Sequence, residues 1–224
     1  MARKVLFVDS DPEAFEGEPC GAGELTLPGR AFSCLYVDPP WRYDNQSTRN
    51  RTTYRESKGT RGTANWNRQG TQYETMSLDE IAALPVPDLT TDQAHLHLWT
   101  TSAFLEDAIY LLKTWGFEYK GFYTWVKPQM GMGNYWRISK EPMLLGVKGK
   151  LRFSVKNEKD WGQFNRRKHS EKPDEVRQII ERVSPGPRLE MFARHIVDGW
   201  VPWGNEIPQR VFHNQLAKCL FGDS

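Results

Sequence analysis

The amino-acid sequence predicts an α/β fold with a mostly parallel sheet, on three observations. Short apolar runs typical of buried strands alternate with segments that have the apolar periodicity of amphipathic helices. Gly, Pro and capping residues separate these segments. The most distinctive motif, Asp38-Pro39-Pro40-Trp41, directly follows an apolar run at residues 32–37. Because ligands of such sheets bind at the carboxyl ends of strands, this motif is expected at a functional site.

The strands are expected to be short and spaced along the whole chain. The run at residues 32–37 ends abruptly at the prolines, as a buried strand entering a rigid loop does. Further strands are expected at residues 5–8, 95–100, 117–126, 141–147, 189–193 and 200–203. A glycine-rich turn, Gly131-Met132-Gly133-Asn134, is expected after the strand at 117–126.

Three helices are expected between these strands, and a fourth after the last of them. Ser77 and Glu80 form a capping box that begins a short helix, which ends before Pro85. Ser102 is expected to cap a helix that runs to residue 115 and ends at Gly116. Apolar periodicity predicts a third helix at 174–183 and a fourth at 208–220. Strands that alternate with helices place the helices on both faces of the sheet.

Length and composition favour one domain. The 224 residues are 38% hydrophobic and 26% charged, which fits a single globular domain at 32–224 after an N-terminal arm at 1–31. Residues 42–74 have almost no aliphatic side chains and are expected to form a long, mobile basic loop. No run is apolar enough for a membrane span or a signal segment. Three scattered cysteines provide neither a disulfide framework nor a zinc site, so a cytoplasmic protein without a metal is expected.

Positive charge is concentrated in two stretches. The net charge of the chain is only +2, whereas residues 42–72 carry seven basic and two acidic side chains, and residues 148–172 carry nine and three. Such concentration suits a polyanion, because binding to phosphates releases counterions. Nine tryptophans add surfaces on which nucleobases stack, above all those in polar surroundings. These are Trp41, Trp66, Trp136, Trp161 and Trp203. Two solvated loops and a Trp-rich core are the alternative interpretation.

The Asp38-Pro39-Pro40-Trp41 motif has the groups needed to hold an aromatic amine. Proline has no N–H group, and two in a row keep the backbone extended, so the carbonyls are expected to be free acceptors. The Asp38 carboxylate and a proline carbonyl can accept both amine hydrogens, while the Trp41 indole stacks on the ring. Acceptors on both N–H bonds help the nitrogen to become tetrahedral and present its lone pair to an electrophile.

The sequence resembles the MT-A70 family of N6-adenine methyltransferases. The resemblance covers the chain from Phe32 to about Glu206 and rests on several motifs in the family's order. They are VDPPWRY from Val37, YETMS from Tyr73, Leu98-Trp99, Trp115-Gly116-Phe117, Trp125-Val126-Lys127, GNYWR from Gly133, EPMLLG from Glu141, HSEKPDE from His169, EMFAR from Glu190 and WGNE from Trp203. Motifs that recur in order are more specific than any one alone.

This resemblance implies a Rossmann-like class I methyltransferase fold that uses S-adenosylmethionine, with the catalytic motif before the cofactor motif. Asp38 to Trp41 would hold the target adenine, Asp38 would also lie near the cofactor amine, and Lys172 would face the cofactor carboxylate. The ribose and adenine side of the cofactor is expected at Phe192, Arg194, Asn205 and Glu206. One departure is Ala193, where many members have Gly; another is His195, which replaces the start of a Pro-His-Asn stretch.

DNA is the expected substrate, and the flipped adenine is its target. Contacts to it are expected from Tyr43, Arg49, Arg51, Arg55, Trp66, Lys127 and Trp136. The same reaction on RNA and a non-catalytic nucleic-acid-binding subunit are the alternatives. A cytosine-N4 enzyme is disfavoured, because those more often have Ser before the prolines. His95 and His97 alternate on a predicted strand and are expected in the core rather than at a metal.

Overall fold

The computed structural model describes residues 31–42, 75–131, 133, 135–167, 171–204 and 206–221. The predicted strand at 5–8, the N-terminal arm and nearly all of the basic loop lie outside these residues. The elements follow in the order β1 (Phe32–Val37), α1 (Leu78–Ala82), α2 (Val86–Leu89), β2 (Thr90–Trp99), η2 (Ser102–Phe104), α3 (Leu105–Thr114), β3 (Glu118–Val126), β4 (Lys140–Lys148), β5 (Trp161–Gln163), α4 (Asp174–Val183), β6 (Arg188–Met191), β7 (Val201–Trp203) and α5 (Gln209–Phe221).

The described strands form one seven-stranded sheet in the order β5-β3-β4-β2-β1-β6-β7. Four of the neighbouring pairs are parallel, and β4 is antiparallel to both β2 and β3. The sheet is therefore mostly parallel, as predicted. β1 lies between β2 and β6 and runs parallel to both, so the carboxyl ends of these three strands share one edge.

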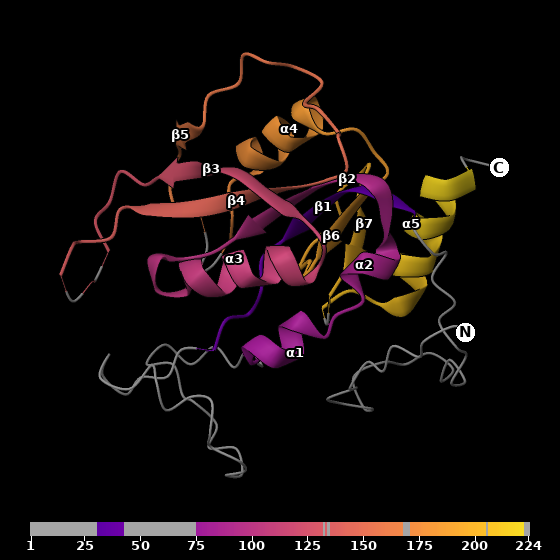
Figure 1. The fold of residues 1–224 in the computed structure, drawn as a ribbon, viewed down its shortest axis with the longest axis horizontal. Coiled ribbons are helices and arrows are strands. Elements are labelled where there is room, and N and C mark those ends of the chain that lie inside the picture. Colours follow the sequence, from indigo (N-terminus) through magenta and orange to yellow (C-terminus); the bar gives the residue numbers. More distant parts are fainter. Residues whose placement is uncertain are drawn as a thin grey trace, which may run out of the picture.

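Helices cover both faces of the sheet, which confirms the predicted layers. Val176 and Ile180 of α4 pack on one face against Cys34, Tyr36 and other buried side chains. The opposite face packs against α1, α3 and α5 in a second core cluster. Figure 1 shows α4 above the sheet and α1 and α3 below it.

Local signals predicted several element boundaries correctly. The Ser77–Glu80 capping box is present: the Ser77 N–H donates to Glu80 Oε2 at 2.7 Å, and the Glu80 N–H donates to Ser77 Oγ at 3.3 Å. Helix α4 has the predicted bounds. Gly116 ends α3 with a φ of 81°, a conformation that glycine adopts without strain.

Three local predictions were wrong or incomplete. Ser102 begins a 3₁₀ turn whose N-cap is Thr101, and α3 itself begins at Leu105. Strand β2 begins at Thr90, five residues before the predicted start; Thr90 pairs with Phe32 of β1, and the register shifts before the regular pairing that begins at His95. Helix α2 and strand β5 were not predicted, because they have only four and three residues and are too short to show periodicity.

Candidate functional site

The Asp38-Pro39-Pro40-Trp41 motif leaves the sheet at the end of β1, as predicted. Its backbone is tied down on both sides of the second proline. The Trp41 N–H donates to the Pro39 carbonyl at 2.8 Å, and the Met76 N–H donates to the Pro40 carbonyl at 2.9 Å. The expectation that both carbonyls are free was therefore wrong. Each carbonyl oxygen has a second lone pair, which can still accept one more hydrogen.

Trp41 is a core residue in this structure. Its side chain is only 8% exposed, and its ring stacks on Phe104 at a centroid separation of 5.1 Å and an angle of 9°. One face of the indole is thus covered by Phe104. Polar neighbours in the sequence suggested exposure, but the indole buries enough apolar area to be drawn into the core. In this position Trp41 anchors the proline turn to the hydrophobic core.

Four charged side chains from four segments form an ion-pair chain at this edge of the sheet. Lys172 Nζ lies 2.7 Å from Asp38 Oδ2 and 3.6 Å from Glu141 Oε2. Lys127 in turn donates to Glu141 Oε1. We call Asp38, Lys172, Glu141 and Lys127 the ion-pair chain; their side chains are between 10% and 30% exposed. Alternating signs allow these charges to lie close together where little water reaches them.

Lys172 is held as an ammonium by its neighbours. Burial by itself lowers the pKa of this side chain, but the charges of Asp38 and Glu141 outweigh burial and raise the pKa. Its Nζ lies 5.4 Å above the centroid of Trp99, and Lys127 Nζ lies 4.5 Å above that of Trp125. Both lysines therefore sit on buried indoles at the ends of β2 and β3, which fixes where their charge points.

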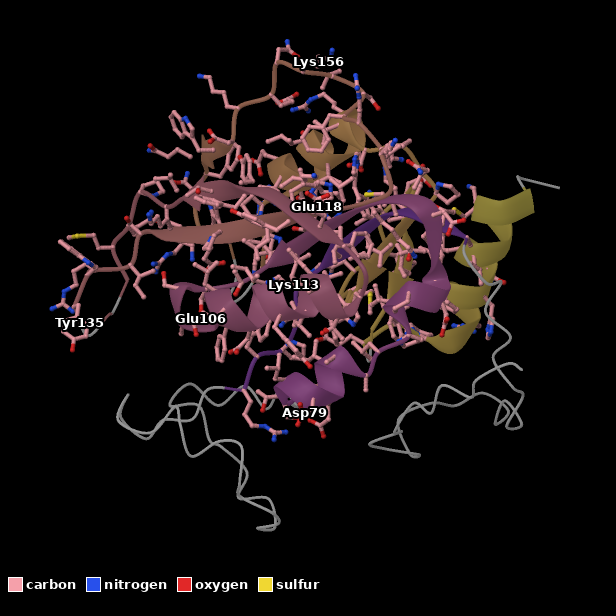
Figure 2. The ribbon with its side chains drawn as sticks, in the orientation of Figure 1. Asp79, Glu106, Lys113, Glu118, Tyr135 and Lys156 are labelled. Atoms are coloured by element: carbon pink, nitrogen blue, oxygen red, sulfur yellow. The ribbon has the colours of Figure 1, made fainter. Side chains whose placement is uncertain are left out.

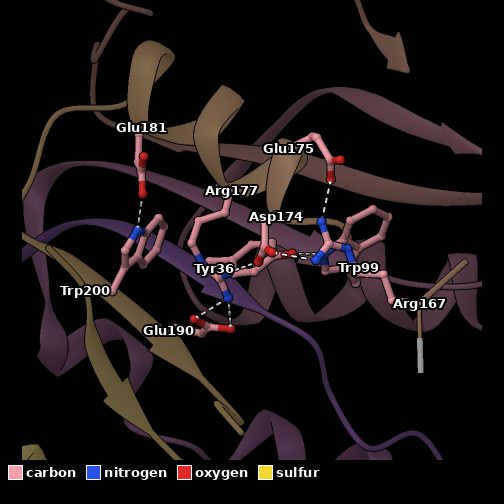
Figure 3. Close-up of polar contacts among 9 residues, drawn as sticks. All are labelled: Tyr36, Trp99, Arg167, Asp174, Glu175, Arg177, Glu181, Glu190 and Trp200. Atoms are coloured by element: carbon pink, nitrogen blue, oxygen red, sulfur yellow. Dashed lines mark hydrogen bonds and ion pairs between the residues drawn. The ribbon is translucent and has the colours of Figure 1, made fainter. Parts of the chain in front are cut away.

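Trp99, which lies under Lys172, belongs to a network of aromatic and charged side chains (Figure 3). Trp99 donates through Nε1 to the Tyr36 hydroxyl at 2.8 Å. The Arg177 guanidinium packs over the rings of Tyr36 and Trp200, and its Nη2 lies 2.7 and 2.8 Å from the two carboxylate oxygens of Glu190. Such a network leaves few alternative rotamers, so the support of the site is rigid.

Strand β6 ends beside β1 in a strained turn. Phe192 has a φ of 63°, which is uncommon for a residue with a side chain and often marks a functional position. The Ala193 N–H donates to the Trp203 carbonyl at 3.0 Å, and a Cβ atom at Gly204 would overlap the Ala193 carbonyl oxygen. This close approach brings Arg194 within 3.9 Å of Glu206.

The structure brings most of the described candidate residues to one edge. Asp38, Lys172 and Lys127 meet in the ion-pair chain. The positive charge of Arg194 is near enough to act on the pKa of Lys172, in the direction opposite to the larger effect of Asp38 and Glu141. Trp136 is separate, at the far end of the loop between β3 and β4, and is 85% exposed. Outside the described residues lie Tyr43, Arg49, Arg51, Arg55, Trp66 and Asn205.

Sequence reasoning missed two acids of this edge. Glu141 belongs to a quoted motif but received no role, and it now links Lys127 to Lys172. Glu190, two residues before Phe192, pairs with Arg177. The sequence does contain a signal for both acids. Each lies within a predicted apolar strand, Glu141 at the start of β4 and Glu190 near the end of β6, where an unpaired charge is costly.

The histidines belong to the core, as expected. His95 and His97 are 0% and 3% exposed, and each has a ring nitrogen 2.9 Å from Ser184 Oγ. Burial lowers the pKa of His97 to about 3, so its ring is neutral at ordinary pH. Among the described residues no group of three or more His, Cys, Asp or Glu side chains is placed to hold a metal ion. No helix in the described part of the chain is long and apolar enough to cross a membrane.

Comparison with known proteins identifies the family. The MT-A70 family profile matches residues 32–206, from the start of β1 past the turn after β7. The chain belongs to the MT-A70 family. It is therefore a methyltransferase by family, and membership confirms that the sheet is that of a Rossmann-like methyltransferase fold.

The similar proteins come from bacteria and eukaryotes. The chain is 34% identical to the type II methyltransferase M.MunI of Mycoplasma sp over 187 residues, which cover 81% of this chain and 80% of that protein. It is 32% identical to the N(6)-adenosine-methyltransferase MT-A70-like protein of Drosophila melanogaster over 82% of this chain and 28% of that protein. The human N(6)-adenosine-methyltransferase catalytic subunit METTL3 is 34% identical over 60% of this chain and 25% of its own length. The chain thus spans most of the Mycoplasma protein and about a quarter of the eukaryotic ones.

Proposed function

We propose that the protein transfers a methyl group from S-adenosylmethionine to the N6 amine of adenine in DNA. One observation carries the proposal: a carboxylate and an ammonium, Asp38 and Lys172, lie 2.7 Å apart where three parallel strands end. Two further observations support it: Asp38 is followed by two carbonyl groups in a rigid turn, and the family consists of methyltransferases.

The chemistry of the Asp38–Lys172 pair fits the amino-acid end of S-adenosylmethionine. That end has an ammonium and a carboxylate, which complement Asp38 and Lys172. The two side chains now neutralise each other, so a ligand of this kind exchanges one ion pair for two. Glu141 stays beside Lys172 during this exchange and keeps the ammonium at the strand edge. Before and after the exchange Asp38 and Lys172 each have a partner of opposite charge, which limits the desolvation cost.

The ends of β6 and β7 are proposed to hold the nucleoside part of the cofactor. The positive φ of Phe192 turns the backbone out of the sheet next to β1. Arg194 and Glu206 are held together there by the close approach of Gly204 to Ala193. Donors and acceptors of both signs suit ribose hydroxyls and an adenine ring. We assign Phe192, Arg194, Asn205 and Glu206 to this part of the site; Asn205 lies outside the described residues.

The cofactor supplies an electrophilic methyl group, and the protein prepares the nitrogen that attacks it. In the reaction the bond from sulfur to the methyl carbon breaks, a bond from N6 to that carbon forms, and N6 loses one proton. Asp38 accepts an N6 hydrogen and is the first acceptor for the departing proton. The remaining lone pair of the Pro39 or Pro40 carbonyl accepts the second hydrogen. Both contacts favour a tetrahedral nitrogen over a planar one, which is positioning and electrostatic catalysis.

DNA is the substrate class that the comparisons favour. The relative that this chain matches along most of both lengths is a type II methyltransferase, and this likeness supports DNA. The likeness to N(6)-adenosine-methyltransferases supports the second candidate, RNA. The positive charge of residues 148–172 suits either polyanion. A non-catalytic subunit is disfavoured, because Asp38 and Lys172 are both present and paired.

A methyl-transfer assay tests the proposal. Purified protein is incubated with tritiated S-adenosylmethionine and either DNA that lacks N6-methyladenine or an unmodified RNA of similar base composition. We expect label in DNA, at least about 100-fold less with Asp38→Asn, and no change with Asp88→Asn, an exposed control on α2. Label in RNA alone would move the reaction to the second candidate. No label in either, together with no heat of cofactor binding by calorimetry, would identify a non-catalytic subunit.

A further inference from the structure

The hairpin between β3 and β4 extends past the edge of the sheet that holds Asp38. Its two arms remain hydrogen-bonded beyond the strands: the Lys127 N–H donates to the Ser139 carbonyl and the Gly131 N–H to the Ile138 carbonyl, both at 2.7 Å. At its base, Glu141 and Lys127 belong to the ion-pair chain. We call residues 127–139 the hairpin end; 132 and 134 are outside the described residues. It begins at the site and points away from the sheet.

Two aromatic side chains project from the hairpin end into solvent. Tyr135 is 93% exposed and Trp136 is 85% exposed, the highest values among the large apolar side chains of the described residues. Figure 2 shows Tyr135 at the outermost point of the hairpin, well away from the sheet. Met130 and Ile138 nearby are exposed as well. Neighbouring large apolar side chains that contribute nothing to the core mark a contact with another molecule.

The backbone next to these rings turns back tightly. A Cβ atom at Gly133 would overlap the Trp136 carbonyl oxygen, so the chain folds back on itself more tightly than a residue with a side chain allows. At Gly131 a Cβ atom would lie 2.9 Å from the Ile138 carbonyl oxygen. The two glycines of the predicted turn therefore allow the tight return that places Tyr135 and Trp136 at the end of the hairpin.

The charge of the hairpin end matches a polyanion. The hairpin end contains Lys127 and Arg137 and no Asp or Glu, and Lys140 follows it directly; because Lys127 is paired with Glu141, the positive charge of the arm comes from Arg137 and Lys140. Arg166, from the segment after β5, lies along the same arm, with its Nη2 3.5 Å from the Gln129 carbonyl. An apolar tip on a basic stem is the arrangement of proteins that push side chains between base pairs while they contact phosphates. A protein partner would not require this absence of acidic residues.

We propose that Tyr135 and Trp136 enter the base stack of duplex DNA next to the target adenine and hold that adenine outside the stack. This inference rests on the proposed function. A base must leave the helix before its N6 atom can reach Asp38, and an aromatic ring that fills the gap recovers part of the lost stacking. Trp136 lies four residues before Lys140, where β4 begins, and four extended residues span roughly 13 Å. The DNA grooves are roughly 8 Å deep, so the hairpin is long enough for Trp136 to reach the base stack.

The test compares variants on three forms of one DNA site, after methylation-aware sequencing has identified that site. The forms are a matched duplex, the same duplex with a mismatch at the target adenine, and the single strand. Trp136→Ala and the double variant with Tyr135→Ala should lose at least about tenfold in transfer rate on the matched duplex. On the mismatched duplex and the single strand the loss should stay below about twofold, because the base is already free. Tyr110→Ala, an exposed aromatic on α3, should change none of the three.

A further variant tests the same proposal without removing an aromatic ring. Gly133→Ala should displace the turn and reproduce the duplex-specific loss, since its Cβ atom meets backbone. Thermal unfolding separates this effect from misfolding, because the hairpin end lies outside both core clusters.

Three results would overturn the inference while leaving the proposed function intact. One is an equal loss on all three DNA forms, another is no loss at all, and the third is wild-type transfer to single strands only. A lower particle mass of the variants by light scattering, with equal losses on every form, would show that the tip binds a protein instead. Absence of wild-type transfer to any DNA would instead refute the proposed function, so the two failures can be told apart.

Discussion

The ion-pair chain and the histidine pair are two polar clusters on the same sheet, and they differ in what their partners are. His95 and His97 lie in the middle of β2, and His95 Nδ1 and His97 Nε2 each form a hydrogen bond with Ser184 Oγ at 2.9 Å. The ion-pair chain lies at the strand ends, where Lys172 and Asp38 remain partly exposed. The histidine pair is satisfied within the chain, whereas the ion-pair chain offers charges that a ligand can take over. In the proposed function, the buried neutral groups stabilise the fold and the partly exposed charges bind the cofactor.

After Asp38→Asn, the largest effect is expected at Lys172. Lys172→Met should weaken S-adenosylmethionine binding by about 10- to 100-fold, because it removes a charge-assisted contact of about 1.5–3 kcal/mol. Asn205→Ala should act in the same direction. Isothermal calorimetry measures both, with Lys156→Met as a control for the loss of one basic side chain from the same stretch. DNA affinity should change much less than cofactor affinity; equal losses for both ligands would place Lys172 outside the cofactor site.

Ser184 tests the other side of the comparison. Ser184→Ala leaves the two buried rings without their shared hydroxyl, which should cost about 1–3 kcal/mol of unfolding free energy. The melting temperature should fall by several degrees, at about 2–4 °C per kcal/mol for a chain of this size. Transfer rate well below the transition should be unchanged. A variant that melts normally but loses activity would reverse the assignment of the two clusters.

The histidine pair should also make stability depend on pH. The pKa of His97 is about 3 in the folded chain and 6.5 without burial, so between these values the unfolded chain binds the additional proton. The contribution of His97 to the free energy of unfolding should therefore be complete above pH 6.5. It should decline as the pH falls towards 3, by up to about 1.4 kcal/mol per pH unit. Denaturant titrations at several pH values measure the slope, which should be smaller in His97→Gln. An equal slope in that variant would mean that other groups cause it.

The smallest effect is expected from the basic loop. Replacing Arg49, Arg51 and Arg55 with Ala should flatten the salt dependence of DNA binding by about 0.9 in log–log slope for each phosphate interaction that the substitutions remove, or about 0.7 on single strands. Cofactor affinity should barely change. Titration of one labelled oligonucleotide at several salt concentrations measures the slope. These arginines lie outside the described residues, so an unchanged slope would remove the loop from the proposed substrate site.

Elements with strong local signals could be predicted from the sequence, whereas contacts between distant segments could not. Helix α4 has the predicted bounds, because its apolar stripe and the preceding proline act locally. Asp38 was placed correctly, because a motif at the end of an apolar run indicates a strand end. The burial of Trp41 depends on Phe104, and the role of Glu141 depends on Lys127 and Lys172. Polarity of the adjacent residues contains no information on such partners.

The central claim is that the edge around Asp38 methylates the N6 amine of adenine. The most direct measurement is mass spectrometry of the nucleosides released from DNA after reaction with S-adenosylmethionine whose methyl group is deuterated. We predict N6-methyladenine that retains all the deuterium of the methyl group, with at least about 100-fold less formed by Asp38→Asn. Deuterated N4-methylcytosine, or N6-methyladenine formed equally well by Asp38→Asn, would contradict the account.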